Sequence, residues 1–66
     1  MKFYLEFPSK ENVNYYIQYR DDVNAPWKTS PTPVRGTGKI VNWLDEGPPN
    51  TESPPSEKRF YRVLAE

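Results

Sequence analysis

Prolines and glycines interrupt this chain so often that a long helix has no room to form. Eight prolines and three glycines are spread over 66 residues. Proline inside a helix removes a hydrogen bond and clashes with the preceding turn. No window places apolar residues at the i, i+3, i+4, i+7 spacing over three turns. The chain is therefore expected to be all-β.

Alternation of apolar and polar side chains predicts where the strands lie. Residues 2–7 and 14–20 each place apolar or aromatic side chains at every second position, as a half-buried strand does. The polar, turn-rich stretch 8–12 between them predicts a hairpin. Further strands are expected at residues 27–29, 39–45 and 59–65. In residues 39–45 two registers are possible, and we favour the one with Val41 and Trp43 inward.

Five strands without a helix predict a small sandwich or open barrel, with residues 1–66 as a single domain. A chain of this length buries only about 60% of its unfolded surface. It has no cysteine and no histidine, so disulfides and the usual zinc ligands are unavailable, and aromatic burial must stabilise the domain. The expected core consists of Phe3, Leu5, Phe7, Tyr15, Ile17, Tyr19, Trp27, Val41, Trp43, Tyr61 and Val63.

Three segments carry a resemblance to known modules: YYIQYRDD followed by Trp27, GTGKIVNWLDEGPP, and RFYRVLAE. Together they resemble a short repeat module found near the C-termini of large secreted bacterial proteins, over residues 15–63. Arg20 stands where that module usually has serine. The segments are also similar to the middle of a fibronectin type III domain, without its final strand.

Both resemblances imply an immunoglobulin-like β-sandwich of about five antiparallel strands. They also imply an extracellular or cell-surface location. The first residues lack the charged and apolar regions of a signal peptide, so an exported protein would carry its signal elsewhere in a longer chain. Sandwiches of this kind host many functions, so the resemblance implies no specific activity.

Composition argues against several classes of function. Nine basic and nine acidic residues cancel, which gives no electrostatic footprint for nucleic acid. No stretch reaches the ~18 apolar residues of a membrane span. Without histidine or cysteine, the commonest general base and the strongest nucleophile are missing. We therefore expect neither an enzyme nor a bound cofactor.

Acidic residues in two predicted turns are weak candidates for calcium. Calcium takes six to eight oxygen ligands, often from carboxylates in loops. The carboxylates would converge only if the two turns lie at one end of the domain, and the alternative is ordinary turn chemistry. The candidates are Asp21, Asp22, Asp45 and Glu46, with Asn24 beside them. Because aspartate caps turns well, we favour turn chemistry and assign no metal site.

Aromatic side chains offer a second possible ligand site. Trp27 and Trp43 could form a platform with Tyr4 or Tyr16 that stacks on sugar rings, whereas the alternative places both tryptophans in the core. Tyr4 and Tyr16 are expected on the outward faces of neighbouring strands, where they would pair or mark a contact surface.

Two functional hypotheses remain. The first is a non-catalytic module for structural spacing or protein contact, with the parent chain or another surface protein as partner. Its contacts would involve a sheet edge or the proline-rich loop 46–58. Because the final strand of a fibronectin type III domain is missing, the sheet edge left open would also allow a homodimer. The second is a carbohydrate-binding module that uses exposed aromatics.

Overall fold

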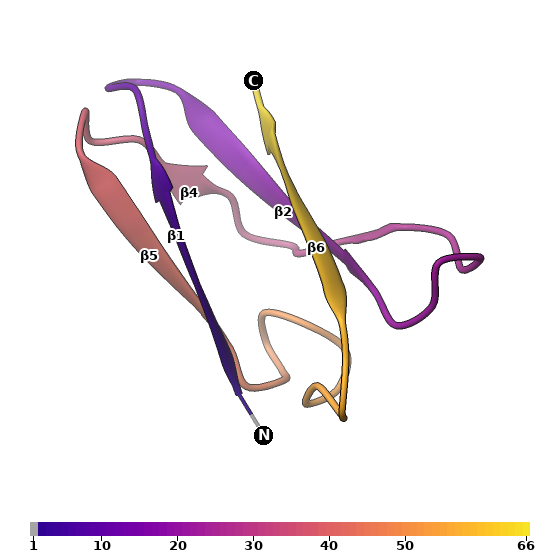
Figure 1. Ribbon diagram of the computed structural model, residues 1–66. Coiled ribbons are helices and arrows are strands. Elements are labelled where there is room, and N and C mark those ends of the chain that lie inside the picture. Colours follow the sequence, from indigo (N-terminus) through magenta and orange to yellow (C-terminus); the bar gives the residue numbers. More distant parts are fainter. Residues whose placement is uncertain (1) are drawn as a thin grey trace.

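The computed structural model describes residues 2–66, and this part of the chain contains strands, turns and loops but no helix (Figure 1). The all-β class expected from the sequence is therefore confirmed. The six strands are β1 (Phe3–Pro8), β2 (Asn14–Arg20), β3 (Lys28–Thr29), β4 (Val34–Arg35), β5 (Ile40–Asp45) and β6 (Phe60–Ala65). The two-residue strand β4 was not predicted.

The strands form two antiparallel sheets. One contains β1 and β5, in a register that places Leu5 opposite Trp43. In the other, β2 is the central strand: β6 pairs along one side of it, and the short strands β3 and β4 pair with the two ends of its other side. Figure 1 shows the β1–β5 ladder as a layer separate from β2 and β6.

The expected hairpin between residues 2–7 and 14–20 is wrong. The stretch 8–12 does make a turn, in which Asn12 has a positive φ of 67°. However, the two strands that flank this turn do not pair with each other. β1, before the turn, pairs with β5, and β2, after it, pairs with β3, β4 and β6. The connection therefore crosses between layers, which lets the apolar faces of β1 and β2 pack against each other rather than lie side by side.

The core lies between the two sheets and is mainly aromatic. Ile17 is fully buried, and Tyr15, Tyr19 and Trp43 are less than a tenth exposed. Aromatic rings meet across the layers: Phe7 with Tyr15 at 5.4 Å, Trp43 with Tyr61 at 6.1 Å and Phe3 with Tyr61 at 6.3 Å between centroids. The inward register expected for Val41 and Trp43 is confirmed, because both lie on the face of β5 opposite the exposed Ile40.

Trp27 was expected in the core and is not there. It is half-buried, and its ring lies beside Arg20, whose centre of charge is 4.2 Å from the ring centroid. The register explains this placement: Lys28 is opposite the inward-facing Tyr19, so the residue before it falls on the outward side with Arg20. A shift of one residue moves a side chain to the other face of a sheet.

Candidate functional site

A buried cluster of charged and polar groups lies where β5 and β6 meet the proline-rich loop. Asp45 is fully buried at the end of β5, and the Arg59 side chain, just before β6, is 2% exposed. Arg59 Nη1 lies 3.0 Å from Asp45 Oδ2, and its Nε lies 2.7 Å from Asp21 Oδ1. Tyr61 Oη donates to Asp45 Oδ2 at 2.6 Å, and Thr51 Oγ1 donates to Asp45 Oδ1 at 2.6 Å.

These hydrogen bonds set the protonation states of the cluster. Burial by itself raises the pKa of Asp45, but the bonds from Thr51, Tyr61, Gly47 and Arg59 outweigh it, so the pKa falls below its ordinary value. Burial and the bond to Asp45 raise the pKa of the Tyr61 hydroxyl, which therefore stays protonated as a donor. The cluster is an ionised aspartate held by a permanent cation and neutral donors.

The lowered pKa of Asp45 predicts a loss of stability in acid. The unfolded chain takes up the proton at a higher pH, near 4, than the native state does. The stabilisation is therefore complete above that pH and is lost as the pH falls through it toward the lower native value. An NMR titration of the Asp45 carboxyl should give a native-state pKa below the ordinary value of an aspartate. Tyr61→Phe, which removes one donor, should move that pKa upward; an unchanged pKa would contradict the argument.

The cluster also organises the proline-rich loop. Arg59 Nη1 donates to the carbonyl of Ser53 at 2.8 Å, and the side chain of Asn50 donates to the carbonyl of Leu44 at 2.8 Å. Gly47 has a φ of +100°, and a Cβ there would lie 2.8 Å from the backbone nitrogen of Pro54. The loop is thus packed back on the domain.

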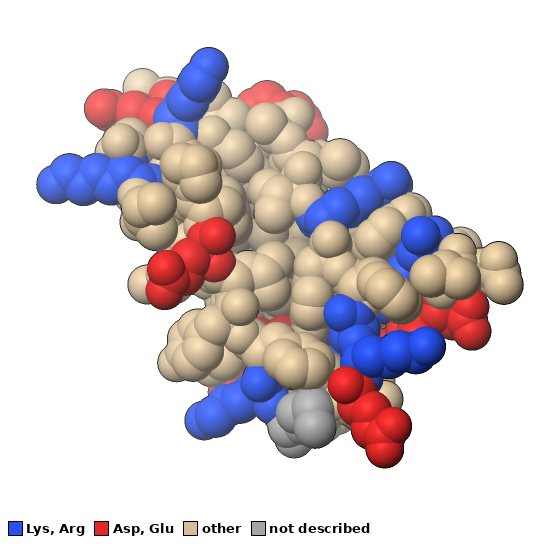
Figure 2. All heavy atoms as spheres, viewed as in Figure 1, with Lys and Arg blue, Asp and Glu red and all other residues tan. Residues whose placement is uncertain are grey.

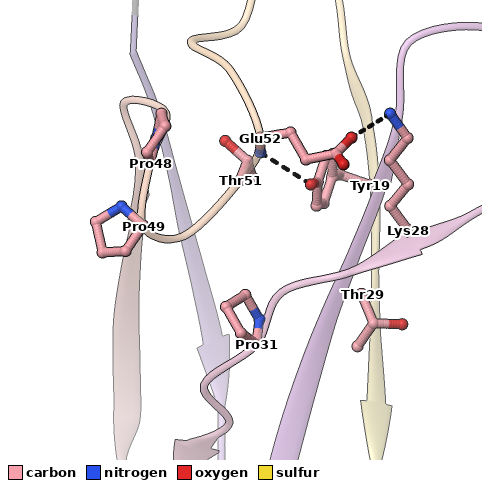
Figure 3. A pocket seen from close by; sticks show the side chains of 8 residues that line it. All are labelled: Tyr19, Lys28, Thr29, Pro31, Pro48, Pro49, Thr51 and Glu52. Carbon is pink, nitrogen blue, oxygen red and sulfur yellow. Dashed lines mark hydrogen bonds and ion pairs between the residues drawn. The ribbon is translucent and has the colours of Figure 1, made fainter.

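One hollow of about 300 Å³ opens between this loop and β3. Figure 3 shows the ion pair of Lys28 with Glu52 and the hydrogen bond from the Glu52 amide to the Tyr19 hydroxyl at its rim. Its lining residues are Tyr19, Lys28, Thr29, Pro31, Pro48, Pro49, Thr51 and Glu52. Because the charged groups at the rim already satisfy each other, the hollow offers a ligand little beyond apolar contact.

The aromatic residues proposed for sugar binding are not brought together. Trp43 is buried between the sheets, whereas Tyr4 is 70% exposed on the outer face of β1. Tyr16 and Trp27 lie on the outer face of the other sheet. The cross-strand partner of Tyr4 is Leu44 and that of Tyr16 is Leu64, so the two tyrosines do not pair as expected. The four side chains therefore occupy three separate places.

The acidic candidates behave as turn and ion-pair residues. Asp21 and Asp45 do converge, but on the guanidinium of Arg59. Asp22 accepts a hydrogen bond from the Asn24 amide, as an aspartate in a turn does, and Glu46 is exposed. No group of three or more acidic side chains within residues 2–66 is placed to hold a metal ion.

The outer face of the β2–β6 sheet carries a stacked arrangement of arginines. The guanidiniums of Arg20 and Arg62 lie over the ring of Trp27, at 4.2 and 4.5 Å from its centroid. Such contacts orient the cations without neutralising them. Figure 2 shows charges of both signs scattered over the side of the molecule seen there.

The free edge of β6 presents unpaired backbone groups. The Glu66 amide donates to Asn14 at 2.8 Å, which marks that position as a hydrogen-bonded pair. Antiparallel pairs alternate between bonded and non-bonded positions. The backbone groups of Phe60, Arg62 and Leu64 therefore point to β2, and those of Tyr61, Val63 and Ala65 point away from it. Within residues 2–66, these outward groups have no hydrogen-bond partner outside the sheet ladders.

The other sheet edges are each partly blunted. Pro8 ends β1 without an amide hydrogen, and the loop residue Asn50 covers part of β5 through the Leu44 carbonyl. The edge formed by β3 and β4 is interrupted by residues 30–33, which include two prolines. Proline and covering loops are the usual means of blunting an edge. β6 is six residues long and contains no proline, and within residues 2–66 no loop bonds to its outward backbone groups.

Sequence reasoning anticipated an open edge but missed the buried Asp45–Arg59 pair. The only signal was an aspartate and an arginine at the ends of two predicted strands, which is common in turns. Comparison with known proteins adds no assignment, because no family model, curated protein or solved structure matches the chain. The described residues include no helix able to cross a membrane.

Proposed function

We propose that this chain is a non-catalytic β-sandwich module of immunoglobulin-like type that makes protein contacts through the free edge of β6. The observation that supports the proposal is the row of amide and carbonyl groups at Tyr61, Val63 and Ala65 with no partner. The resemblance to modules of secreted proteins makes an extracellular or surface setting the natural one for it.

Strand addition is the recognition mode that fits such an edge. An extended segment of a partner takes up the free amides and carbonyls, and its alternating side chains contact the two faces of the sheet. The outer face next to this edge offers Phe60 and Leu64, which are 36% and 42% exposed. The partner would therefore gain backbone hydrogen bonds together with apolar contacts.

Protein contact is favoured over the two other roles considered. A sugar platform needs several aromatic rings on one surface, and the rings of Trp27 and Trp43 lie on different sides of a sheet, one beside arginines and one in the core. A catalytic role would need an ionisable group free to react. The most perturbed groups, Asp45 and Tyr61, are bonded to each other.

Proline at position 65 tests the edge directly. The Ala65 amide faces away from β2, so Ala65→Pro removes a donor from the free edge without removing a β2–β6 hydrogen bond. Extended peptides selected from a random library against the wild-type chain should lose binding to Ala65→Pro and keep it to Ala65→Ser. Bound peptides should also slow hydrogen exchange at the amides of Tyr61, Val63 and Ala65.

The control variant Ala65→Ser keeps the amide and the local size, so it separates the loss of the donor from the change of side chain. Circular dichroism of both variants checks that the sheets remain folded. Peptides that bind Ala65→Pro as tightly as the wild type, or that leave the three amides unprotected, would overturn the proposed use of this edge.

A further inference from the structure

We infer that the partner strand is β6 of a second copy of this chain, paired antiparallel so that Leu64 faces Leu64 and each Arg62 faces Glu66 of the other copy. The inference rests on the proposed use of the β6 edge and adds the identity of the partner and the register. The two copies would then share one continuous antiparallel sheet around a two-fold axis.

The hydrogen-bonding pattern of β6 permits this pairing. With Leu64 on the two-fold axis, Val63 of one copy lies opposite Ala65 of the other. Both residues turn their amide and carbonyl groups to the free edge. Each such position can exchange two hydrogen bonds, as bonded pairs in antiparallel ladders do. The backbone groups of Leu64 stay with β2, so the existing sheet is unchanged.

Charge complementarity selects the register. Within residues 2–66, Arg62 and Glu66 each make no ion pair, and both lie on the outer face by the alternation of β6. Cross-strand partners of opposite charge stabilise a pair of strands, whereas like charges opposite each other destabilise it. Sliding the second copy by two residues toward Phe60 would face Arg62 with leucine, and sliding it by four would face Arg62 with Arg62.

In the free chain, the Arg62 side chain leans across β2 toward β3, away from the free edge of β6. Its guanidinium lies over the Trp27 ring, and its Nε donates to the side chain of Gln18. Pairing with Glu66 of the second copy would require Arg62 to leave these two contacts and turn to the other side of β6, which offsets part of the gain from the ion pair.

Leu64 supplies the apolar centre of the interface. It is 42% exposed and sits opposite Tyr16 on β2. In the proposed register, two leucines would meet at a non-bonded position, where facing side chains come closest. On the outer face, Arg62 would then lie opposite Glu66, Leu64 opposite Leu64, and Glu66 opposite Arg62 of the second copy. The two-fold axis therefore makes the same surface complementary to itself.

Two charge-reversal variants test the register. Arg62→Glu and Glu66→Arg should each weaken self-association by about tenfold or more, because each puts two like-charged pairs into the dimer. Mixed in equal amounts, they should associate at least as well as the wild type, because every pair in the mixed dimer joins opposite charges. Sedimentation velocity over a micromolar-to-millimolar series measures all four samples, and circular dichroism checks folding.

The outcomes separate the two proposals. A wild-type chain that stays monomeric throughout the series overturns the second copy as the partner, while peptides blocked by Ala65→Pro would still support the edge. A dimer that the charge reversals leave unchanged overturns the register. A dimer that persists in Ala65→Pro lies elsewhere on the surface and overturns the inference as a whole.

Discussion

Asp45→Asn should remove a large part of the stability of this domain, about 3–5 kcal/mol. The carboxylate is fully buried and lies 3.0 Å from a guanidinium that is 2% exposed. Removing the charge of Asp45 leaves the buried end of the Arg59 guanidinium with only the half-exposed Asp21 as a counter-charge, and breaking a buried pair costs far more than the net gain from forming it. Asparagine is nearly the same size, so no cavity forms, but its NH2 group also puts a donor where an oxygen accepted hydrogen bonds. Urea denaturation followed by tryptophan fluorescence measures the change.

Asp21→Asn is the matched control, because Asp21 bonds to the same guanidinium from a side chain that is 53% exposed. Exposed ion pairs contribute about 1 kcal/mol or less. A double-mutant cycle with Arg59→Met separates the buried pair from the rest of the cluster. Equal losses for Asp21→Asn and Asp45→Asn would contradict the assignment of Asp45 as the buried centre.

Ile17→Ala should cost about 2–4 kcal/mol, the range for truncating a large aliphatic side chain in a core. Ile17 lies at the middle of the central strand β2, and none of its surface is accessible to solvent. The lost transfer energy and the cavity add together. A domain of this size has little stability to spare, so the variant should be largely unfolded at moderate urea concentrations.

Val63→Ala is the comparison for this prediction, since Val63 lies directly opposite Ile17 on β6 but is only half-buried. Its truncation should cost about 1 kcal/mol, because less apolar area leaves water on folding. An Ile17→Ala variant that unfolds cooperatively with a loss no larger than that of Val63→Ala would contradict the central role given to Ile17.

Local patterns in the sequence determined the strands and their faces. Prolines and glycines excluded helices, and the period of two placed Tyr15, Ile17 and Tyr19 on one face of β2, all of which are buried. These features depend on each residue and its close neighbours, because the pleat alone decides which way a side chain points. The same reasoning located β1, β5 and β6 to within a residue or two.

Only the tertiary structure decided which strands pair and what their ends bring together. Nothing local in the sequence favours β5 over β2 as the partner of β1, since both strands carry a suitable apolar face. The choice depends on how two aromatic faces fill one interior, which involves residues far apart in the chain. The bond between Asp45 and Arg59 depends on where the ends of β5 and β6 meet, and the outward place of Trp27 follows from the register of β3 on β2. A turn aspartate becomes a buried ion because the ends of β5 and β6 meet beneath the loop that joins them.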